Sequence, residues 1–256
     1  DAIDPSLQAN YLVNIDERQS LAVTAKNHMP LVYDDPDKFV RKGMHHARDI
    51  LDIRHPANES SGIKNHLNLA DQHAKNASQL IKTTWDNYKT PIDYGINPMG
   101  LNKVAAMIAG GVNSKIFHTS YRHNAFDTHV QQVNLHQRLL MYVSDAIDAF
   151  MKDIKRIGRQ NDVTVVVFSE FGRRAAENTS MGTDHGTANH MYVIGHTVKG
   201  GHYGKAPSLT DLDDGGNLKY TVDFRSVYAS VIENWMGYKN SSAILHKEFD
   251  KFQLWS

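Results

Sequence analysis

The chain has 256 residues, in which 28 lysine and arginine residues balance 28 aspartate and glutamate residues. A formal net charge of zero excludes the global basic surface typical of nucleic-acid binding, and no apolar run reaches the roughly 18 residues of a transmembrane helix. The absence of cysteine excludes disulfides and thiolate metal ligands, so histidine, aspartate and glutamate are the strong ligands available. We therefore expect no nucleic-acid partner and no transmembrane segment.

The first third of the chain predicts peripheral elements. Residues 20–24 and Leu31–Tyr33 fit two short strands, and the following residues to about position 88 are polar, histidine-rich and helical in pattern. We expect residues 1–35 to form peripheral strands that lead into the core. Residues 36–95 are expected to form a helical insertion, and residues 96–256 an α/β core.

The remaining sequence alternates between strand and helix patterns. An alternation of this kind predicts an α/β fold with a doubly wound, mostly parallel sheet flanked by helices. The long helix has an apolar stripe, with Val133, Leu140, Phe150 and Ile154 among its members. The predicted elements are a helix at Leu101–Ala109, a strand at Lys115–Ser120, a helix from about His129 to Arg156, strands at Val163–Phe168 and Met191–Gly195, and a helix at Phe224–Trp235.

The β-branched run Val163–Phe168 is typical of a strand covered on both faces in a parallel sheet. Ligands of open α/β sheets bind beyond the carboxyl ends of the strands, which is where Glu170 and Arg173 follow this run. A carboxylate there can ligate a cation, and an arginine can hold an anion through two parallel hydrogen bonds. The alternative is a surface Glu–Arg pair, which contributes little to stability.

Two further clusters carry metal-ligating side chains. Asp127 and His129 would point to the same side of an extended segment and could serve one metal centre. The alternative is that Thr128 and Gln131 form a capping box at the start of the long helix. A third cluster combines an acid with two imidazoles in a loop rich in glycine and threonine: Asp184, His185 and His190.

Several motifs carry a resemblance to a known family. These are FDTHxxQ from Phe126, VVVFSEFGRR from Val165, GTDHGTANHMYVIG from Gly182 and LKYTVDFRSVYA from Leu218. The sequence resembles the bacterial family called domain of unknown function 1501, densely from about Phe126 to Trp235. That family is similar to the alkaline-phosphatase and sulfatase superfamily, whose members use one or two divalent metals to hydrolyse phosphate or sulfate esters. The resemblance implies an alkaline-phosphatase-like fold and twin-arginine export to the periplasm.

The resemblance also assigns roles to individual residues. It implies that one or two divalent ions, zinc foremost with manganese or calcium as alternatives, are bound in this chain, and that Arg173 binds a small anionic ester substrate. Glu170 departs from the superfamily pattern, which commonly has Asp-His after this strand. The implied metal ligands are Asp127, His129, Glu170, Asp184, His185 and His190.

Family members begin with a strand, a glycine-rich turn that contains aspartate, and the region where the superfamily places its nucleophile. The resemblance therefore implies that this chain corresponds to the C-terminal two-thirds of such a protein. We expect an N-terminal segment of the same protein to supply the nucleophile and to be a partner of this chain. The sequence leaves two hypotheses: a metal-dependent hydrolase of phosphate or sulfate esters, and a non-catalytic exported binding or scaffold protein with the same fold.

Overall fold

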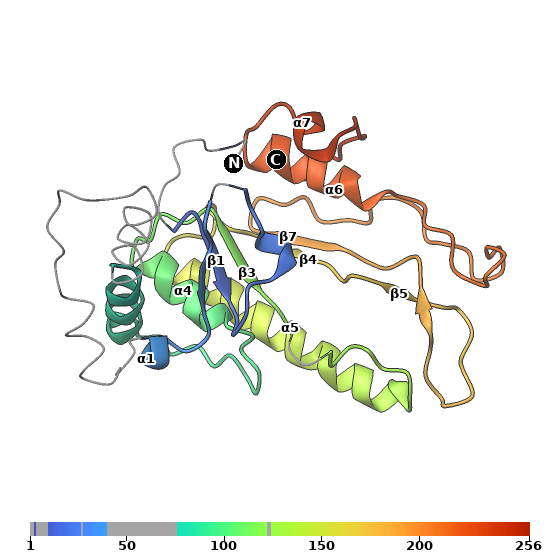
Figure 1. Cartoon of the computed structure of the whole chain (residues 1–256), viewed down its shortest axis with the longest axis horizontal. Helices are drawn as coiled ribbons and strands as arrows, with labels where there is room; N and C mark the ends of the chain where they lie inside the picture. Colours follow the sequence, from blue (N-terminus) through green and yellow to red (C-terminus); the bar gives the residue numbers. More distant parts are fainter. Residues whose placement is uncertain (1–2, 4–9, 27, 40–75, 122–123) are drawn as a thin grey trace, which may run out of the picture. The chain divides into compact units, whose positions relative to one another are not determined.

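A computed structural model describes residues 3, 10–26, 28–39, 76–121 and 124–256 (Figure 1). The described residues fall into two compact units. One contains Pro98–Ser120 and the described residues between Ile3 and Tyr94, and the other contains Gly95–Asn97 and those from Tyr121 to Ser256. Among these residues, no helix combines the length and apolar character that crossing a membrane requires.

The first unit is built on a three-stranded parallel sheet. Its strands are β1 (Leu12–Ile15), β2 (Leu31–Tyr33) and β3 (Ile116–Thr119), in the order β2-β1-β3. In this register Val13 pairs with Leu31 on one side and with Phe117 on the other. All four residues of β1 are buried, as expected for a central strand.

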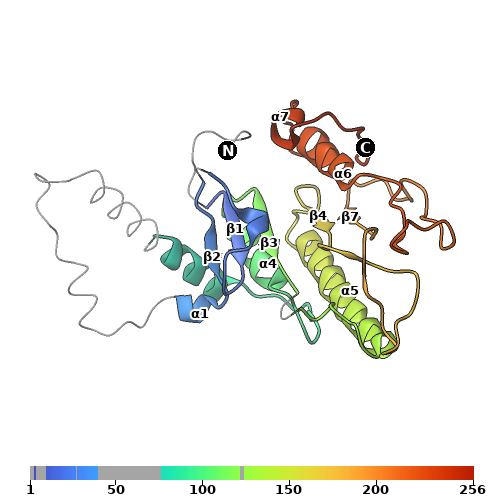
Figure 2. The ribbon, with the colours of Figure 1, turned by 45° about the vertical axis from the view of Figure 1, so that its right-hand side comes forward.

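Helix α4 (Leu101–Ala109) lies beside this sheet in both views (Figures 1 and 2). Helix and sheet are in contact where the Tyr33 hydroxyl donates to the Met107 sulfur at 3.1 Å. Gly100 precedes the helix with φ +74°, and a Cβ at this position would lie 2.8 Å from the Ile15 side chain. The turn into α4 therefore requires glycine, both for its left-handed backbone and for this close approach.

The predicted strand at Leu31–Tyr33, the helix at Leu101–Ala109 and the strand within Lys115–Ser120 are confirmed. The strand predicted at residues 20–24 is wrong. Residues Leu21–Val23 form the 3₁₀ turn η1, because the Ser20 side chain caps it by accepting a hydrogen bond from the Ala22 amide. Most of the predicted helical insertion, residues 40–75, lies outside the described residues. Its described flanks are helix α1 (Pro36–Phe39) and helical residues 76–87.

The second unit contains the long helix α5 (Gln132–Arg156) and the antiparallel pair β4 (Thr164–Val167) and β7 (Tyr192–Gly195). The helix lies next to this pair (Figure 2). The predicted helix and the strand at Met191–Gly195 are confirmed. The predicted apolar stripe is wrong at Val133 and Leu140, which are exposed, because Leu139 and small alanines occupy the buried face together with Phe150 and Ile154.

The predicted strand within Val163–Phe168 is confirmed, but the prediction that it is parallel and covered on both faces is wrong. Strand β4 pairs antiparallel with β7, and its residues are half-buried. Parallel neighbours need a crossover connection, usually a helix, whereas residues 168–191 contain none. That connection instead carries a small ribbon, in which β5 (Gly172–Arg173) pairs with β6 (His185–Gly186).

The chain then forms a helical segment near its C-terminal end. Helix α6 (Phe224–Ser230) continues into the π-helical turn η3 (Val231–Trp235), which confirms the predicted helix, and α7 (Ser242–Leu245) contacts α6. Asp223 caps α6 by accepting from the Arg225 amide at 2.9 Å. The described residues mix helices with small sheets, one of them parallel, so the α/β prediction is confirmed at this coarse level.

Candidate metal site

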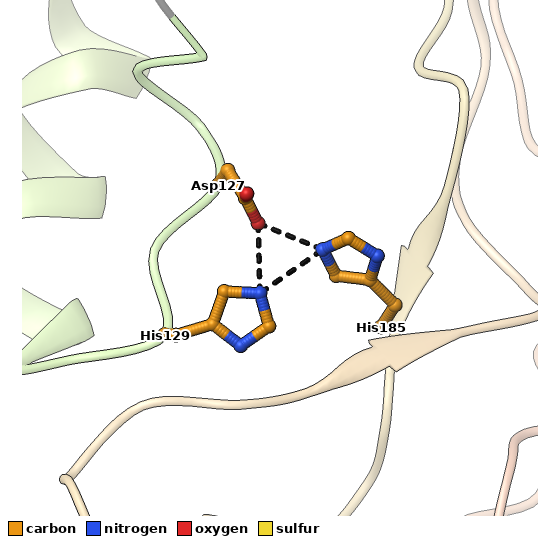
Figure 3. Close-up of side chains that lie close together, drawn as sticks. All are labelled: Asp127, His129 and His185. Atoms are coloured by element: carbon orange, nitrogen blue, oxygen red, sulfur yellow. Dashed lines mark hydrogen bonds and ion pairs between the residues drawn. The ribbon is translucent and has the colours of Figure 1, made fainter.

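Three side chains in the second unit point toward one another (Figure 3). The Oδ1 atom of Asp127 lies 2.9 Å from Nε2 of His129 and 2.7 Å from Nε2 of His185. The two imidazole nitrogens lie 3.1 Å apart. One carboxylate oxygen and two imidazole nitrogens thus form a nearly equilateral triangle. Between 34% and 47% of each side chain remains exposed, so water and a small ligand can reach it.

Local structure explains how the chain assembles this triangle. Asp127 and His129 lie in the non-helical segment before α5, and Gln131, with φ +44°, turns the chain into the helix. The helix begins at Gln132 and its N-cap, Gln131, makes no side-chain capping bond, so the alternative that Thr128 and Gln131 form a capping box is wrong. His185 comes from β6, where it is the direct pair of Arg173 on β5.

Hydrogen bonds alone do not satisfy the three polar atoms of the triangle. If both Nε2 atoms carry hydrogens that they donate to Asp127, two N–H groups face each other at 3.1 Å. If one nitrogen lacks its hydrogen, its contact with the carboxylate becomes an acceptor facing an acceptor. A cation between two deprotonated nitrogens and the carboxylate satisfies all three contacts.

The distances and the donor chemistry fit such an ion. Zinc binds imidazole nitrogen at about 2.0–2.1 Å and carboxylate oxygen at about 2.0–2.2 Å, so neighbouring ligand atoms in a tetrahedral site are roughly 3.3 Å apart. The three observed separations, 2.7 to 3.1 Å, are a few tenths of an ångström shorter. A small outward shift of the ligands would accommodate an ion lying just outside the plane of the triangle.

A second carboxylate orients His129 from its far side. Nδ1 of His129 lies 3.4 Å from Oδ1 of Asp184, and this oxygen also accepts from the Asn178 side-chain amide at 3.2 Å. A histidine that donates one ring nitrogen to a carboxylate presents the lone pair of the other nitrogen, as metal-ligating histidines usually do. Asp184 is thus placed to fix the tautomer of His129 and does not belong to the triangle itself.

Asn178 and Gly182 hold the loop before β6 against His129. The Asn178 side-chain amide donates to the His129 carbonyl at 3.0 Å, and its oxygen accepts from the amides of Ser180 and Gly182. A Cβ on Gly182 would lie 2.3 Å from the carbonyl carbon of His129. The backbone can therefore approach the histidine this closely only at a glycine.

Arg173 lies behind the triangle with 17% of its side chain exposed. Its guanidinium donates to the carbonyls of Thr183 and Phe126 at 2.6 and 2.8 Å, and to Oδ1 of Asp127 at 3.1 Å. The ring of Phe171 stacks on the His185 imidazole, with centroids 3.8 Å apart and planes at 11°. Arg173 therefore supports Asp127, and Phe171 supports His185.

The surroundings favour the charged forms of both aspartates. The hydrogen bond from His185, followed by the nearby His129 and Arg173, lowers the pKa of Asp127. The hydrogen bonds from Asn178 and then His129 lower the pKa of Asp184. Both carboxylates are therefore ionised at neutral pH, as ligation by Asp127 and tautomer control by Asp184 require.

The model of one protein family, described as a protein of unknown function (DUF1501), matches residues 8–247. The chain belongs to the DUF1501 family. Searches of curated proteins and of solved structures returned no match to it. Family membership confirms the resemblance seen in the sequence, whereas the relation to alkaline phosphatases and sulfatases remains a prediction.

Three of the six predicted ligands of this DUF1501 protein lie outside the triangle: Asp184, which faces Nδ1 of His129, and Glu170 and His190. Glu170 is exposed at the end of β4 and is not among the described residues whose ligand atoms converge. His190 is also exposed, and its ring lies against that of Tyr192, with centroids 6.4 Å apart. The sequence placed both near the strand ends but contained no information on the direction of their side chains.

Several residues that shape the site of the DUF1501 chain were not predicted from its sequence. Phe171 lies within a quoted motif without being assigned a role, and Asn178 lies four residues before the motif that begins at Gly182. A third is Gln132, whose amide donates to the hydroxyl of the buried Thr128 at 2.8 Å and whose oxygen accepts from the Thr183 hydroxyl at 3.1 Å. The glutamine three positions after His129 in the FDTHxxQ motif was the available signal.

Proposed function

We propose that Asp127, His129 and His185 bind one divalent metal ion and that the resulting site hydrolyses phosphate or sulfate esters. The observation that carries the proposal is the triangle of one carboxylate oxygen and two imidazole nitrogens, all within 3.1 Å of one another. A divalent ion in such a site lowers the pKa of a coordinated water and polarises an ester oxygen. The exposure of the triangle supports access for the substrate.

The ligand types favour zinc over calcium. Calcium takes six to eight oxygen ligands, whereas two of the three donors here are imidazole nitrogens. Catalytic zinc sites commonly have three protein ligands and keep a further position open for water or substrate. Manganese, which also accepts mixed nitrogen and oxygen ligands, is the second candidate. The proposal is for one ion, because the described residues contain one group of this kind.

An alkaline-phosphatase-like fold is part of the same proposal. Its supports are the mixed α/β architecture, the parallel sheet β2-β1-β3 and the position of the triangle near residues that follow β4. A solved structure of a DUF1501 protein, compared with solved alkaline phosphatases, tests this part. A different strand order in the core would contradict it.

One observation favours the second candidate, a metal-binding protein without hydrolase activity. Three hydroxyls in the segment between β4 and β7 donate to protein acceptors: Ser169 to the Phe171 carbonyl, Thr183 to Gln132, and Thr187 to the Leu218 carbonyl. A hydroxyl nucleophile is usually activated by a neighbouring base. Water activated by the ion is therefore the nucleophile that the hydrolase proposal requires.

The two candidates are separated by one set of assays. The purified protein is stripped with chelator and reloaded with zinc, manganese or calcium, and both metal content and hydrolysis of aryl phosphate and aryl sulfate are measured. The hydrolase proposal predicts turnover with zinc or manganese that is lost in His185→Ala and retained in the matched control His190→Ala. Stoichiometric metal without turnover of either ester favours the second candidate, and a protein that retains no metal contradicts both.

A further inference from the structure

Arg173 connects the two chain segments that carry the triangle. Its guanidinium binds the carbonyl of Phe126, the residue before Asp127, and the carbonyl of Thr183, two residues before His185. It also donates directly to the Asp127 carboxylate at 3.1 Å. A planar guanidinium presents its donors in a fixed fork, so these contacts fix the two segments relative to each other.

The same contacts leave little of the guanidinium for an anion. Nη2 donates to two acceptors, the Phe126 carbonyl and Asp127 Oδ1, while Nη1 donates to the Thr183 carbonyl. Bidentate binding of a phosphate or sulfate uses either the Nη1–Nη2 pair or the Nε–Nη2 pair. Both pairs include Nη2, so a bidentate anion would have to displace a protein acceptor that is already in place.

Arg173 also supports the third member of the triangle. Its guanidinium carbon lies 5.0 Å from the centroid of the Phe171 ring, which in turn stacks on the His185 imidazole. In the β5–β6 ribbon, Arg173 is moreover the direct backbone pair of His185. Arg173 thus contacts the Asp127 carboxylate directly and the His185 imidazole through the Phe171 ring.

We propose that Arg173 is a positioning residue, which orients Asp127 and His185 for the metal ion and does not bind the substrate anion. The inference rests on the proposed function, because it takes the triangle to be the metal site. It also replaces the anion-binding role that the family resemblance implied for Arg173. Partners that orient metal ligands typically change metal affinity or activity by about 10–100-fold when they are mutated.

The test uses cobalt chloride as the probe, since the visible spectrum of bound Co²⁺ reports the geometry of its ligands. Three quantities are measured for the wild type, Arg173→Met and Arg173→Lys: the affinity for cobalt, the visible spectrum of bound cobalt, and the inhibition of aryl ester hydrolysis by inorganic phosphate. The control is Arg159→Met, because the exposed Arg159 lies beyond the C-terminal end of α5, where its guanidinium pairs with Asp162. We expect Arg173→Met to weaken cobalt binding by about 10–100-fold and to shift the spectrum, with no change in the control.

Arg173→Lys carries the test if the methionine variant does not fold. It keeps the positive charge, but a single ammonium lacks the planar fork that spans two carbonyls, so we expect partial rescue with a smaller spectral shift. Unchanged cobalt affinity and an unchanged cobalt spectrum in both variants would overturn the positioning role. A loss of phosphate inhibition in the same variants would support anion binding by Arg173. A wild-type protein that binds no cobalt would contradict the proposed function itself and the inference with it.

Discussion

The Nε2 atoms of His129 and His185 lie 3.1 Å apart, and both face the same carboxylate oxygen of Asp127. Two imidazole nitrogens in this position cannot both donate to the same carboxylate oxygen without crowding their two hydrogens together. A cation removes the conflict, because it interacts favourably with all three lone pairs.

Asp127→Asn should abolish stoichiometric zinc binding. The amide removes the negative charge of the ligand while preserving its shape, and metal ligands must be deprotonated to bind. Zinc affinity is measured by competition with a chromophoric chelator. Glu170→Gln is the matched control, because Glu170 is exposed and lies outside the triangle. Equal affinities of the two variants would count against Asp127 as a ligand.

Asp184→Asn should weaken zinc binding by about 10-fold without abolishing it. The substitution weakens the acceptor that faces Nδ1 of His129 at 3.4 Å, and with it the tautomer that presents Nε2 to the ion. The same competition titration measures the effect. Glu177→Gln, a change of an exposed carboxylate nearby in sequence, should leave the affinity unchanged. A complete loss of binding in Asp184→Asn would instead identify Asp184 as a direct ligand.

Gly182→Ala should destabilise the second unit by about 1–3 kcal/mol, because overpacking of this size has that typical cost. The new Cβ would lie 2.3 Å from backbone atoms of His129, which cannot move aside as a flexible side chain would. Urea unfolding measures the change. Gly200→Ala is the control, since no atom lies within 4 Å of a Cβ at that position. Similar unfolding curves for the two variants would contradict the close approach at Gly182.

Asp223→Ala should reduce the free energy of unfolding by about 1 kcal/mol at neutral pH, because it removes the cap of α6. Hydrogen bonds from Arg225 lower the pKa of Asp223 below its ordinary value of 3.8. A lowered pKa in the folded state means that the contribution is present above the unfolded pKa and is lost as the pH falls through the folded value.

The difference in unfolding free energy between wild type and Asp223→Ala should therefore shrink below about pH 4, the range in which an unperturbed aspartate titrates. Urea unfolding at pH 7 and at pH 3 measures this difference. Asp214→Ala, which changes an exposed loop aspartate, should show little effect at either pH. A difference that grows toward acid pH would show that the sign is wrong.

Short apolar runs bounded by glycine or turn residues were sufficient to predict β2, α4, β3 and β7. The central strand β1 was missed because Asn14 interrupts its apolar run. Asn14 is fully buried, and its side chain donates to the Arg18 carbonyl and accepts from the Ser20 amide. The sequence does not reveal that these partners satisfy the buried amide, so an apolar run interrupted by a polar residue is weak evidence for a core strand.

The candidate site shows the same division between local and tertiary information. Spacing alone indicated that Asp127 and His129 share one side of an extended segment. The arrival of His185 beside them depends on the pairing of β5 with β6, which are two residues long and have no detectable periodicity. Glu170 and His190 lie outside the triangle because their side chains do not point toward it. Their positions near the ends of strands do not determine that direction.

The most direct test of the central claim is a crystal structure of the zinc-loaded protein, with anomalous diffraction measured at the zinc absorption edge. We expect one anomalous peak per chain, about 2.0–2.2 Å from Oδ1 of Asp127, Nε2 of His129 and Nε2 of His185. A zinc peak at other residues, or a zinc-soaked crystal in which these three side chains contact only one another, would contradict the claim.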